Sequence, residues 1–187
     1  MVDTALVSSN HLANLKVEQI ELSPMSTEDA KGVLRWRYDP PFDWYNPPAE
    51  SIEAIANLLN PRWQFHSVKV DSTLLAYASF GADGRVPGGD YREAAVDIGL
   101  GVAPQFTGQG LGSPIVTAIV RFALRNQKSS MARLTVARFN QRAIRLYTRL
   151  GFKHEQEFVH EQMPYWVMVR RQFENDEQDL SRSVASP

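Results

Sequence analysis

The feature that most constrains this chain is a glycine-rich run between a predicted strand and a predicted helix. The run Gly108-Gln-Gly-Leu-Gly112 has glycine at every second position and follows the apolar segment Asp97–Val102. Ser113-Pro114 comes next and predicts a helix start, with Ser113 at the N-cap and Pro114 at the first helical position. Glycines let a backbone approach a ligand closely, and the free amides and the helix dipole favour an anion. This order of elements predicts a phosphate cradle.

The residues around the loop argue against two common phosphate sites. No Lys-Ser or Lys-Thr pair follows the glycines, as the usual nucleoside triphosphate loop requires. The spacing G-x-G-x-G, with no early strand before it, also differs from the dinucleotide fingerprint. Taken alone, the loop is equally well explained as a flexible turn between a strand and a helix.

A second motif downstream decides between these interpretations. Residues 134–152 predict a strand, a short turn and a helix that ends at Gly151. Together with the glycine loop, this segment resembles the GNAT superfamily of acetyl-CoA-dependent N-acetyltransferases. That family holds the pyrophosphate of CoA in an R/Q-x-x-G-x-G/A loop, which Thr107–Gly112 matches here. Its pattern N-x-x-A-x-x-x-Y-x-x-x-G-F is matched by Asn140, Ala143, Tyr147, Gly151 and Phe152.

The resemblance covers roughly residues 94–152 and, more loosely, the whole predicted fold. Two motifs in the right order are more specific than either motif alone. Thr107 departs from the family pattern, which has Arg or Gln at that position. This departure removes one side-chain contact but leaves the backbone cradle in place.

Length and composition indicate one globular domain. The 187 residues suit a single core, and the formal net charge of −1 gives no basic field for nucleic acid and no polybasic block for a membrane. The absence of cysteine excludes disulfides and thiolate metal sites and fits a reducing compartment. No apolar run is long enough to span a bilayer, and residues 1–14 lack a secretory pattern. We therefore expect a cytoplasmic protein that binds neither nucleic acid nor membrane.

The order of the predicted elements gives an α/β (α+β) fold. We expect a GNAT-like mixed, mostly antiparallel sheet of six or seven strands, flanked by helices on both faces. The domain spans residues 16–173, preceded by a flexible tail, 1–15, and followed by a disordered polar tail, 174–187. The segment Ala94–Ala103 is the predicted central strand, and a long glycine-rich loop, 81–93, precedes it.

An aromatic segment near the N-terminus is the candidate acceptor site. Residues 36–48 contain four prolines, which prevent a regular helix or a central strand. The structural interpretation is a loop whose aromatic rings pack on the core and hold it in place. The functional interpretation is a substrate wall, because amphipathic aromatic residues line small-molecule clefts, and the resemblance implies an acceptor site here. The candidate substrate-binding residues are Trp36, Tyr38, Phe42, Trp44 and Tyr45.

The second motif places two polar side chains along one face of a helix. Asn140 and Tyr147 are seven residues apart, which is about two helical turns. Taken by themselves, Asn140 is an N-cap and Tyr147 a core ring with its hydroxyl at the surface. The resemblance implies instead that Asn140 lies along the cofactor and that Tyr147 protonates the departing thiolate.

The central strand is the second candidate contact for the cofactor. Gly99 and Gly101 indicate a bulge or the close approach of another backbone. If the strand parts from its neighbour after Ile98, its free backbone groups can pair with the pantetheine arm. The resemblance implies that Leu100 and Val102 offer these groups. The full set of candidate cofactor-binding residues is Leu100, Val102, Thr107, Gly108, Gln109, Gly110, Leu111, Gly112, Ser113, Asn140 and Tyr147.

The general base is the least determined part of the site. Asp97 is the first candidate because it lies on the central strand, and its alternative is a structural carboxylate paired with arginine. Weaker candidates are Glu93, His66 and His160, and a water relay would need no single base. Three cations, Arg121, Arg125 and Lys128, are candidates for the ribose phosphate of CoA or simply form a solvated helix face.

The sequence thus predicts acetyl transfer from acetyl-CoA, the co-substrate, to a primary amine by direct attack through a tetrahedral intermediate, without a metal. The acceptor is a small amine or a peptide N-terminus, and a homodimer is possible. The first alternative is a non-catalytic acyl-CoA-binding or sensing module of the same fold. The second is a phosphotransferase, against which the missing lysine argues.

Overall fold

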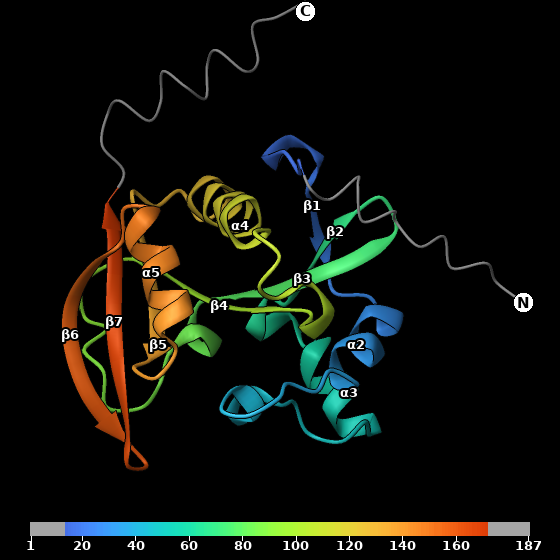
Figure 1. The fold of residues 1–187 in the computed structure, drawn as a ribbon, viewed down its shortest axis with the longest axis horizontal. Helices are drawn as coiled ribbons and strands as arrows, with labels where there is room; N and C mark the ends of the chain where they lie inside the picture. Colours follow the sequence, from blue (N-terminus) through green and yellow to red (C-terminus); the bar gives the residue numbers. More distant parts are fainter. Residues whose placement is uncertain (1–13, 172–187) are drawn as a thin grey trace, which may run out of the picture.

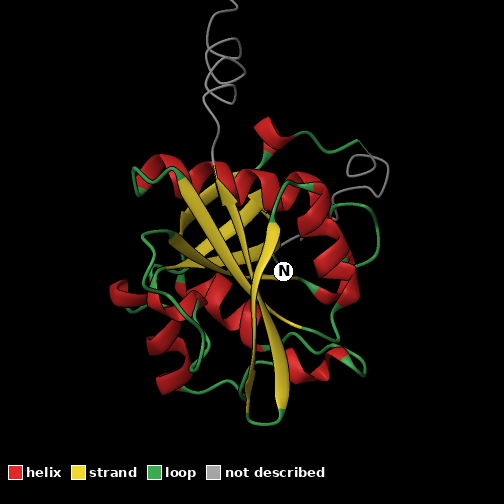
Figure 2. Cartoon of the chain, turned by 90° about the vertical axis from the view of Figure 1, so that its left-hand side faces the viewer, coloured by secondary structure: helices red, strands yellow, loops and turns green. Residues whose placement is uncertain are grey.

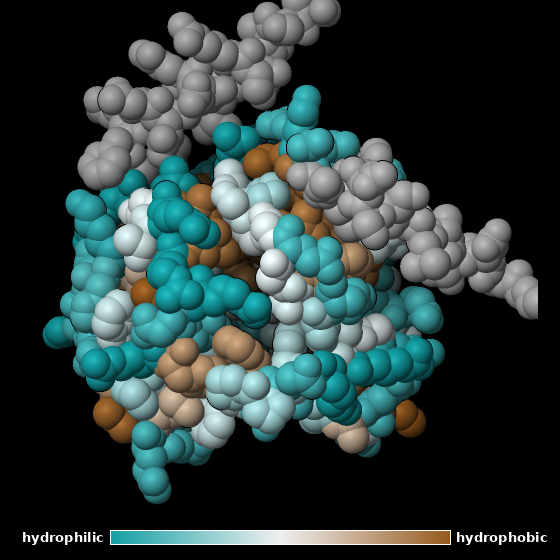
Figure 3. Space-filling model, in the orientation of Figure 1, coloured by the Kyte–Doolittle hydropathy of each residue, from teal (hydrophilic) through white to brown (hydrophobic). Residues whose placement is uncertain are grey.

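The structure is a computed structural model that describes residues 14–171. The predicted tail at residues 174–187 and nearly all of the predicted tail at residues 1–15 lie outside the described residues. Within residues 14–171, no helix combines the length and the apolar character needed to cross a bilayer. The face seen in Figure 3 is largely hydrophilic, and its apolar residues form small separate groups.

A seven-stranded sheet forms the centre of the molecule, in the order β1-β2-β3-β4-β5-β7-β6 (Figure 1). Only β4 and β5 are parallel neighbours, and every other pair is antiparallel. This confirms the predicted mixed, mostly antiparallel sheet. The strands are β1 (Glu21–Pro24), β2 (His66–Val70), β3 (Thr73–Phe80), β4 (Val96–Val102), β5 (Met131–Ala137), β6 (Lys153–His160) and β7 (Met163–Arg171).

Helices cover both faces of this sheet (Figure 2). On one face, α4 (Gly112–Asn126) and α5 (Gln141–Arg149) bury their apolar stripes against the larger core cluster. On the other face, α2 (Thr27–Leu34) and α3 (Ile52–Leu58) enclose a smaller cluster. The glycine loop leads into α4 and the aromatic segment follows α2, so the two segments adjoin helices on opposite faces of the sheet.

Polar caps start three of the four α-helices among the described residues. Ser26, Ser51 and Asn140 accept the backbone N–H of the third helical residue of α2, α3 and α5. The predicted cap of α4 is wrong, because α4 already begins at Gly112, and Leu111 occupies the N-cap without a side-chain bond. Pro114 is tolerated as the third helical residue because the first turn leaves its N–H groups unbonded in any case.

Short 3₁₀ helices precede two of the strands. Val17–Gln19 lies before β1, and Pro61–Trp63 lies before β2, which begins at His66. Ile52, the first residue of α3, is 83% exposed.

The parallel pair β4–β5 separates halfway along its length. β4 pairs with β5 only at Val96, Asp97 and Ile98, opposite residues 132–134. Beyond that point, β4 continues along β3 and β5 continues along β7, and the two ribbons diverge in Figure 1. The predicted parting of β4 after Ile98 is thus present. We call the resulting gap the fork.

Candidate functional site

The glycine loop has the backbone geometry of an anion-binding turn. Gly108 and Gly110 have φ angles of 77° and 80°, which favour glycine, while Leu111 is right-handed helical with φ −73°. Alternation of left- and right-handed residues turns successive N–H groups toward one point. The first bond of α4 runs from the N–H of Ile115 to Leu111, so the amides before it face the loop rather than the helix. The loop therefore presents free backbone N–H groups beside the N-terminus of α4.

Arg142 brings a cation to this cradle. Its Nη1 lies 3.7 Å from the position that a Cβ on Gly108 would occupy. Its guanidinium also lies 4.9 Å from the ring centroid of Phe42, which is within cation–π range. Thr107, by contrast, donates its hydroxyl to the carbonyl of Pro104 at 2.9 Å. Thr107 carries no charge, and the cation near the loop is Arg142 of α5, two residues after Asn140. Sequence analysis did not identify Arg142.

The three cations suggested for the ribose phosphate lie at the other end of α4. Arg121 is nine residues beyond Gly112, which is roughly 13 Å along the helix axis. It forms a long ion pair with Glu18 at 3.7 Å, and Arg125 and Lys128 are further still and exposed. The solvated helix face is the interpretation that their position favours.

Backbone groups of β4 point into the fork. The N–H of Ala103 donates to the carbonyl of Leu75, and the N–H of Gly81 donates to the carbonyl of Asp97. These two bonds show that the odd-numbered residues of β4 are the ones that bond to β3. Because bonding alternates along an antiparallel pair, Leu100 and Val102 direct their N–H and C=O groups to the opposite side, toward β5. The β4–β5 pairing has ended there. The carbonyl of Val102 accepts the hydroxyl of Tyr38 at 2.9 Å.

Gly99 and Gly101 are required by side chains and backbone that lie against the strand. A Cβ on Gly101 would lie 2.6 Å from the Tyr77 ring. A Cβ on Gly99 would collide with the hydroxyl of Ser79, and the backbone of Gly84 lies close by. The predicted close approach of a second backbone is therefore correct for Gly99.

Tyr147 is a buried residue of α5 that belongs to the larger core cluster. Its ring packs near Phe152, with 6.0 Å between ring centroids, and the residue is 7% exposed. Burial raises the pKa of its phenol far above the ordinary value, and the nearby Tyr45 and Tyr77 add to the shift. The phenol therefore keeps its proton at neutral pH.

Asn140 has the structural role that its position suggested. Its Oδ1 accepts the N–H of Ala143 at 3.1 Å and caps α5. Its Nδ2 donates to the hydroxyl of Tyr45 at 3.5 Å, at the limit of a hydrogen bond. This bond connects α5 to the aromatic segment.

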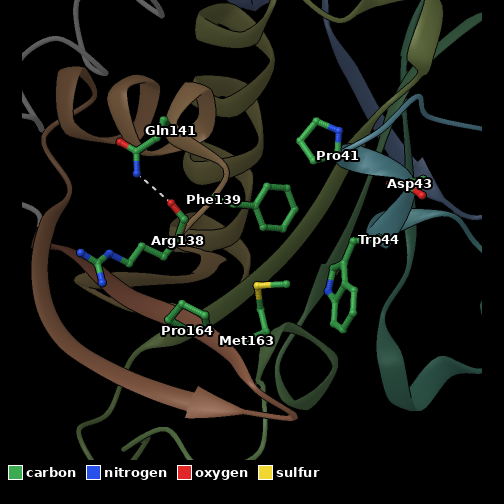
Figure 4. A pocket seen from close by; sticks show the side chains of 8 residues that line it. All are labelled: Pro41, Asp43, Trp44, Arg138, Phe139, Gln141, Met163 and Pro164. Carbon is green, nitrogen blue, oxygen red and sulfur yellow. Dashed lines mark hydrogen bonds between the residues drawn. The ribbon is translucent and has the colours of Figure 1, made fainter.

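The aromatic segment borders two hollows. The wider one, of about 910 Å³, lies between this segment, the β5–α5 turn and the β6–β7 turn, and Trp44, Phe139 and Met163 are among its walls (Figure 4). The smaller one, of about 210 Å³, has Trp36, Tyr38 and Tyr45 in its lining. Phe42 lines neither of these hollows and instead packs on Phe139 and Arg142.

Asp97 is held by two arginines at the closed end of the fork. Its carboxylate accepts from Arg133 at 2.5 and 3.1 Å and from Arg85 at 2.6 Å. The side chains of Asp97 and Arg133 are 1% and 3% exposed. A carboxylate bonded in this way has few lone pairs left for an amine, so the geometry favours the structural alternative over the role of base.

The weaker base candidates also have structural partners. Glu93 pairs with Arg171 at 3.1 Å, and the ring of His66 packs between Phe80 and Phe122. His160 lies at the end of β6, 3.9 Å from Glu161. Their contacts link them to neighbours other than Leu100, Val102 and Tyr147.

Asp83 is the carboxylate that sequence analysis missed. It belongs to a short 3₁₀ helix, Ala82–Gly84, within the segment predicted as a flexible loop. The residue is exposed, yet its Oδ2 lies 3.5 Å from the Cβ position of Gly99. Desolvation raises the pKa of this carboxyl, and the nearby Ser79 hydroxyl lowers it in part. Ser79 Oγ is buried and makes no hydrogen bond of good geometry. The sequence feature that points to this contact is Gly84, because the lack of a side chain there lets the turn touch β4.

Comparison with known proteins supports one family. The model of the acetyltransferase (GNAT) family matches residues 30–152. The aminoglycoside acetyltransferase AAC(6')-Ib, solved with paromomycin and acetyl-CoA, superposes with a TM-score of 0.67 at 19% identity, over 90% of this chain and 99% of that one. Spermidine N-acetyltransferase from Vibrio cholerae, solved with CoA and spermine, gives a TM-score of 0.66 at 18% identity, over 83% and 96%. No curated protein sequence matches the chain. At these identities the superpositions establish the fold.

Proposed function

Because this chain belongs to the GNAT acetyltransferase family, we propose that it transfers the acetyl group of acetyl-CoA to a primary amine by direct attack. One observation carries the proposal: the glycine loop follows the end of β4 that has parted from β5, and it lies against α5 at Leu146 and Arg142. A diphosphate held by the loop would place acetyl-CoA between β4 and the helix that carries Tyr147. The acceptor is a small amine or a peptide N-terminus, and the lack of cysteine accords with a cytoplasmic enzyme.

The residues of the cradle suit the cofactor. The amides of residues 108–113, the start of α4 and the Arg142 guanidinium all favour a diphosphate. Leu100 and Val102 direct backbone groups into the fork and suit the amides of a pantetheine arm. When bound, acetyl-CoA supplies an activated acetyl group as a thioester.

Three residues of the chain perform the chemical work that remains. The N–H of Leu100 stabilises negative charge on the acetyl oxygen in the transition state. Tyr147 holds the proton that the departing sulfur requires, since burial keeps its phenol neutral. Asp83 takes the proton of the attacking amine through water, and Asp97 keeps β4 in position instead.

The test combines acetyl-CoA binding with the release of free thiol in the presence of a panel of primary amines. The wild-type protein binds acetyl-CoA and releases thiol with at least one amine. Binding without turnover by any amine indicates the non-catalytic acyl-CoA module. ATP affinity that depends on magnesium indicates the phosphotransferase.

Gly110→Asp tests the cradle itself. No heavy atom lies within 4 Å of a Cβ at this position, so the new side chain has room, although the φ of 80° strains any side chain there. The aspartate places a like charge at the diphosphate. We expect acetyl-CoA binding to be lost. Gly110→Asn is the matched control, since it has the same shape and backbone demand without the charge, and it should retain more affinity. Wild-type affinity in Gly110→Asp would remove the basis of the proposal.

A further inference from the structure

The smaller of the two hollows, which we call the aromatic pocket, is unusual in its lining. It measures about 210 Å³ and lies between α2, α3 and the aromatic segment. Its walls are mostly aromatic or aliphatic, its polar side-chain groups are tyrosine hydroxyls, the Trp36 indole N–H and one asparagine, and no lining side chain carries a formal charge. The lining includes Trp36, Tyr38, Tyr45, Ala54, Phe65 and Tyr77.

The inner end of the aromatic pocket reaches the fork. Tyr38 donates its hydroxyl to the carbonyl of Val102, and the Tyr77 ring lies against Gly101. Tyr147 in turn lies within electrostatic range of Tyr45 and Tyr77, both of which line the pocket. A molecule seated among these rings therefore has one end near Gly101 and Val102, in the half of β4 that β5 leaves unpaired.

We propose that the aromatic pocket receives the carbon body of the acceptor, and that the acceptor is a primary amine bearing one aromatic or branched aliphatic group. This inference rests on the proposed acetyl transfer. It names a class of acceptor different from the polycations, aminoglycoside and spermine, found in the two similar structures.

Desolvation is the physical reason for this choice. An apolar group gains free energy in proportion to the area it buries, and the stacked rings of Trp36 and Tyr77, with centroids 5.8 Å apart, offer flat surfaces for it. A second ammonium group in the same place would lose its hydration and find no carboxylate among the lining residues. The charged groups Asp43 and Arg138 belong to the wider hollow instead.

The size of the aromatic pocket limits the acceptor further. The volume of about 210 Å³ holds a phenyl ring with a short chain, but not an aminoglycoside. Small, closed, mostly apolar sites with few polar groups bind ligands by shape and orient them with those polar groups. Here the tyrosine hydroxyls occupy the end that faces the fork.

The first experiment measures thiol release from acetyl-CoA with four amines under identical conditions: 2-phenylethylamine, isoamylamine, spermidine and kanamycin. We expect kcat/KM for the first two to exceed that for the polycations at least tenfold. A preference for spermidine or kanamycin overturns the inference and leaves acetyl transfer standing. A protein that binds no acetyl-CoA, or acetylates none of a wide panel of amines, overturns both.

The second experiment fills the aromatic pocket. Ala54→Phe projects a ring into it, while Ala56→Phe, two residues along α3, adds the same ring at an exposed position outside it. We expect Ala54→Phe to raise KM for 2-phenylethylamine at least tenfold at unchanged acetyl-CoA affinity, and Ala56→Phe to change neither. If circular dichroism shows that Ala54→Phe does not fold, Ala54→Leu takes its place. Equal KM values in the folded Ala54 variant and wild type contradict the inference.

Discussion

The two halves of β4 differ in their pairing and in their side chains. In the first half, Val96–Ile98, the strand is paired on both sides, and Asp97 joins Arg133 and Arg85. In the second half, Gly99–Val102, the strand is paired only with β3, and two glycines replace side chains. One half is therefore closed by ion pairs, and the other is left open along its backbone.

This difference assigns stability and chemistry to separate stretches of one strand. A buried ion pair holds β4 and β5 together where they touch, which fixes the point at which they part. The open half keeps backbone donors and acceptors directed at a gap that a ligand can fill. Substitutions in the closed half should therefore affect folding, and substitutions around the open half should affect binding and turnover.

The largest expected effect is on the closed half. Asp97→Asn leaves Arg133 buried without its counter-charge, which should cost about 3–5 kcal/mol of unfolding free energy, measured by urea denaturation. Arg85→Gln is the control, because it removes the half-exposed partner of the same carboxylate and should cost less than about 1 kcal/mol. If Asp97→Asn folds normally but turnover falls a hundredfold or more, Asp97 is the base after all.

Tyr147→Phe addresses the open half. It keeps the ring but removes the proton donor, so kcat should fall about a hundredfold, or roughly 2.7 kcal/mol, at unchanged acetyl-CoA affinity. Because burial raises the pKa of Tyr147, the wild-type rate should show no loss from this phenol below about pH 10.

Tyr91→Phe is the matched control at the closed half, where the Tyr91 hydroxyl bonds to the backbone of Val86. This variant should lose about 1 kcal/mol of stability and keep its kcat. A loss of kcat in Tyr91→Phe equal to that in Tyr147→Phe would remove the distinction between the two halves.

Arg142→Gln tests the cation at the cradle. Loss of one charge-assisted contact, worth about 1.5–3 kcal/mol, should raise the dissociation constant of acetyl-CoA about 10–100-fold and reduce its salt dependence. Arg145→Gln lies on the same helix and is exposed, so it should leave binding nearly unchanged. Equal effects of the two variants, measured by isothermal titration calorimetry, would mean that only the overall charge of α5 matters.

The smallest expected effect comes from Asp83→Asn, which should reduce kcat/KM about tenfold if a water relay carries the proton. The same change should slightly raise stability at pH 7, by less than about 1 kcal/mol because the residue is exposed. The raised pKa of Asp83 means that the fold disfavours its ionised form.

The stability difference between Asp83→Asn and wild type should depend on pH. Below the ordinary carboxyl pKa both folded and unfolded chains are protonated, so variant and wild type should melt alike. As the pH rises, the unfolded wild type loses its proton first and the fold loses stability until the raised pKa is passed. Asp83→Asn should therefore gain over wild type as the pH rises above about 4, the ordinary carboxyl value. A stability difference that does not change as the pH rises above that value would contradict this prediction.

Local chemistry explains why much of the site was predictable. A cap such as Asn140, a positive φ at Gly110 and the end of α5 at Gly151 depend on residues close in sequence, and each is present. The start of α4 was misplaced because a glycine can itself enter the helix, which moved Ser113 past the N-cap. The roles of Asp97, Asp83 and Arg142 depended on partners from other elements, which no local pattern contains.

By itself, the sequence determined the motifs: a glycine loop before a helix, and a capped helix bearing Asn140 and Tyr147 on one face. Only the tertiary structure decided that Asp97 is held by arginines, that Asp83 lies beside Gly99, and that the cation near the glycine loop comes from α5. The physical reason is range, because caps and turns arise from neighbours a few residues apart. Ion pairs and clefts arise from register and packing between elements that the chain separates by tens of residues.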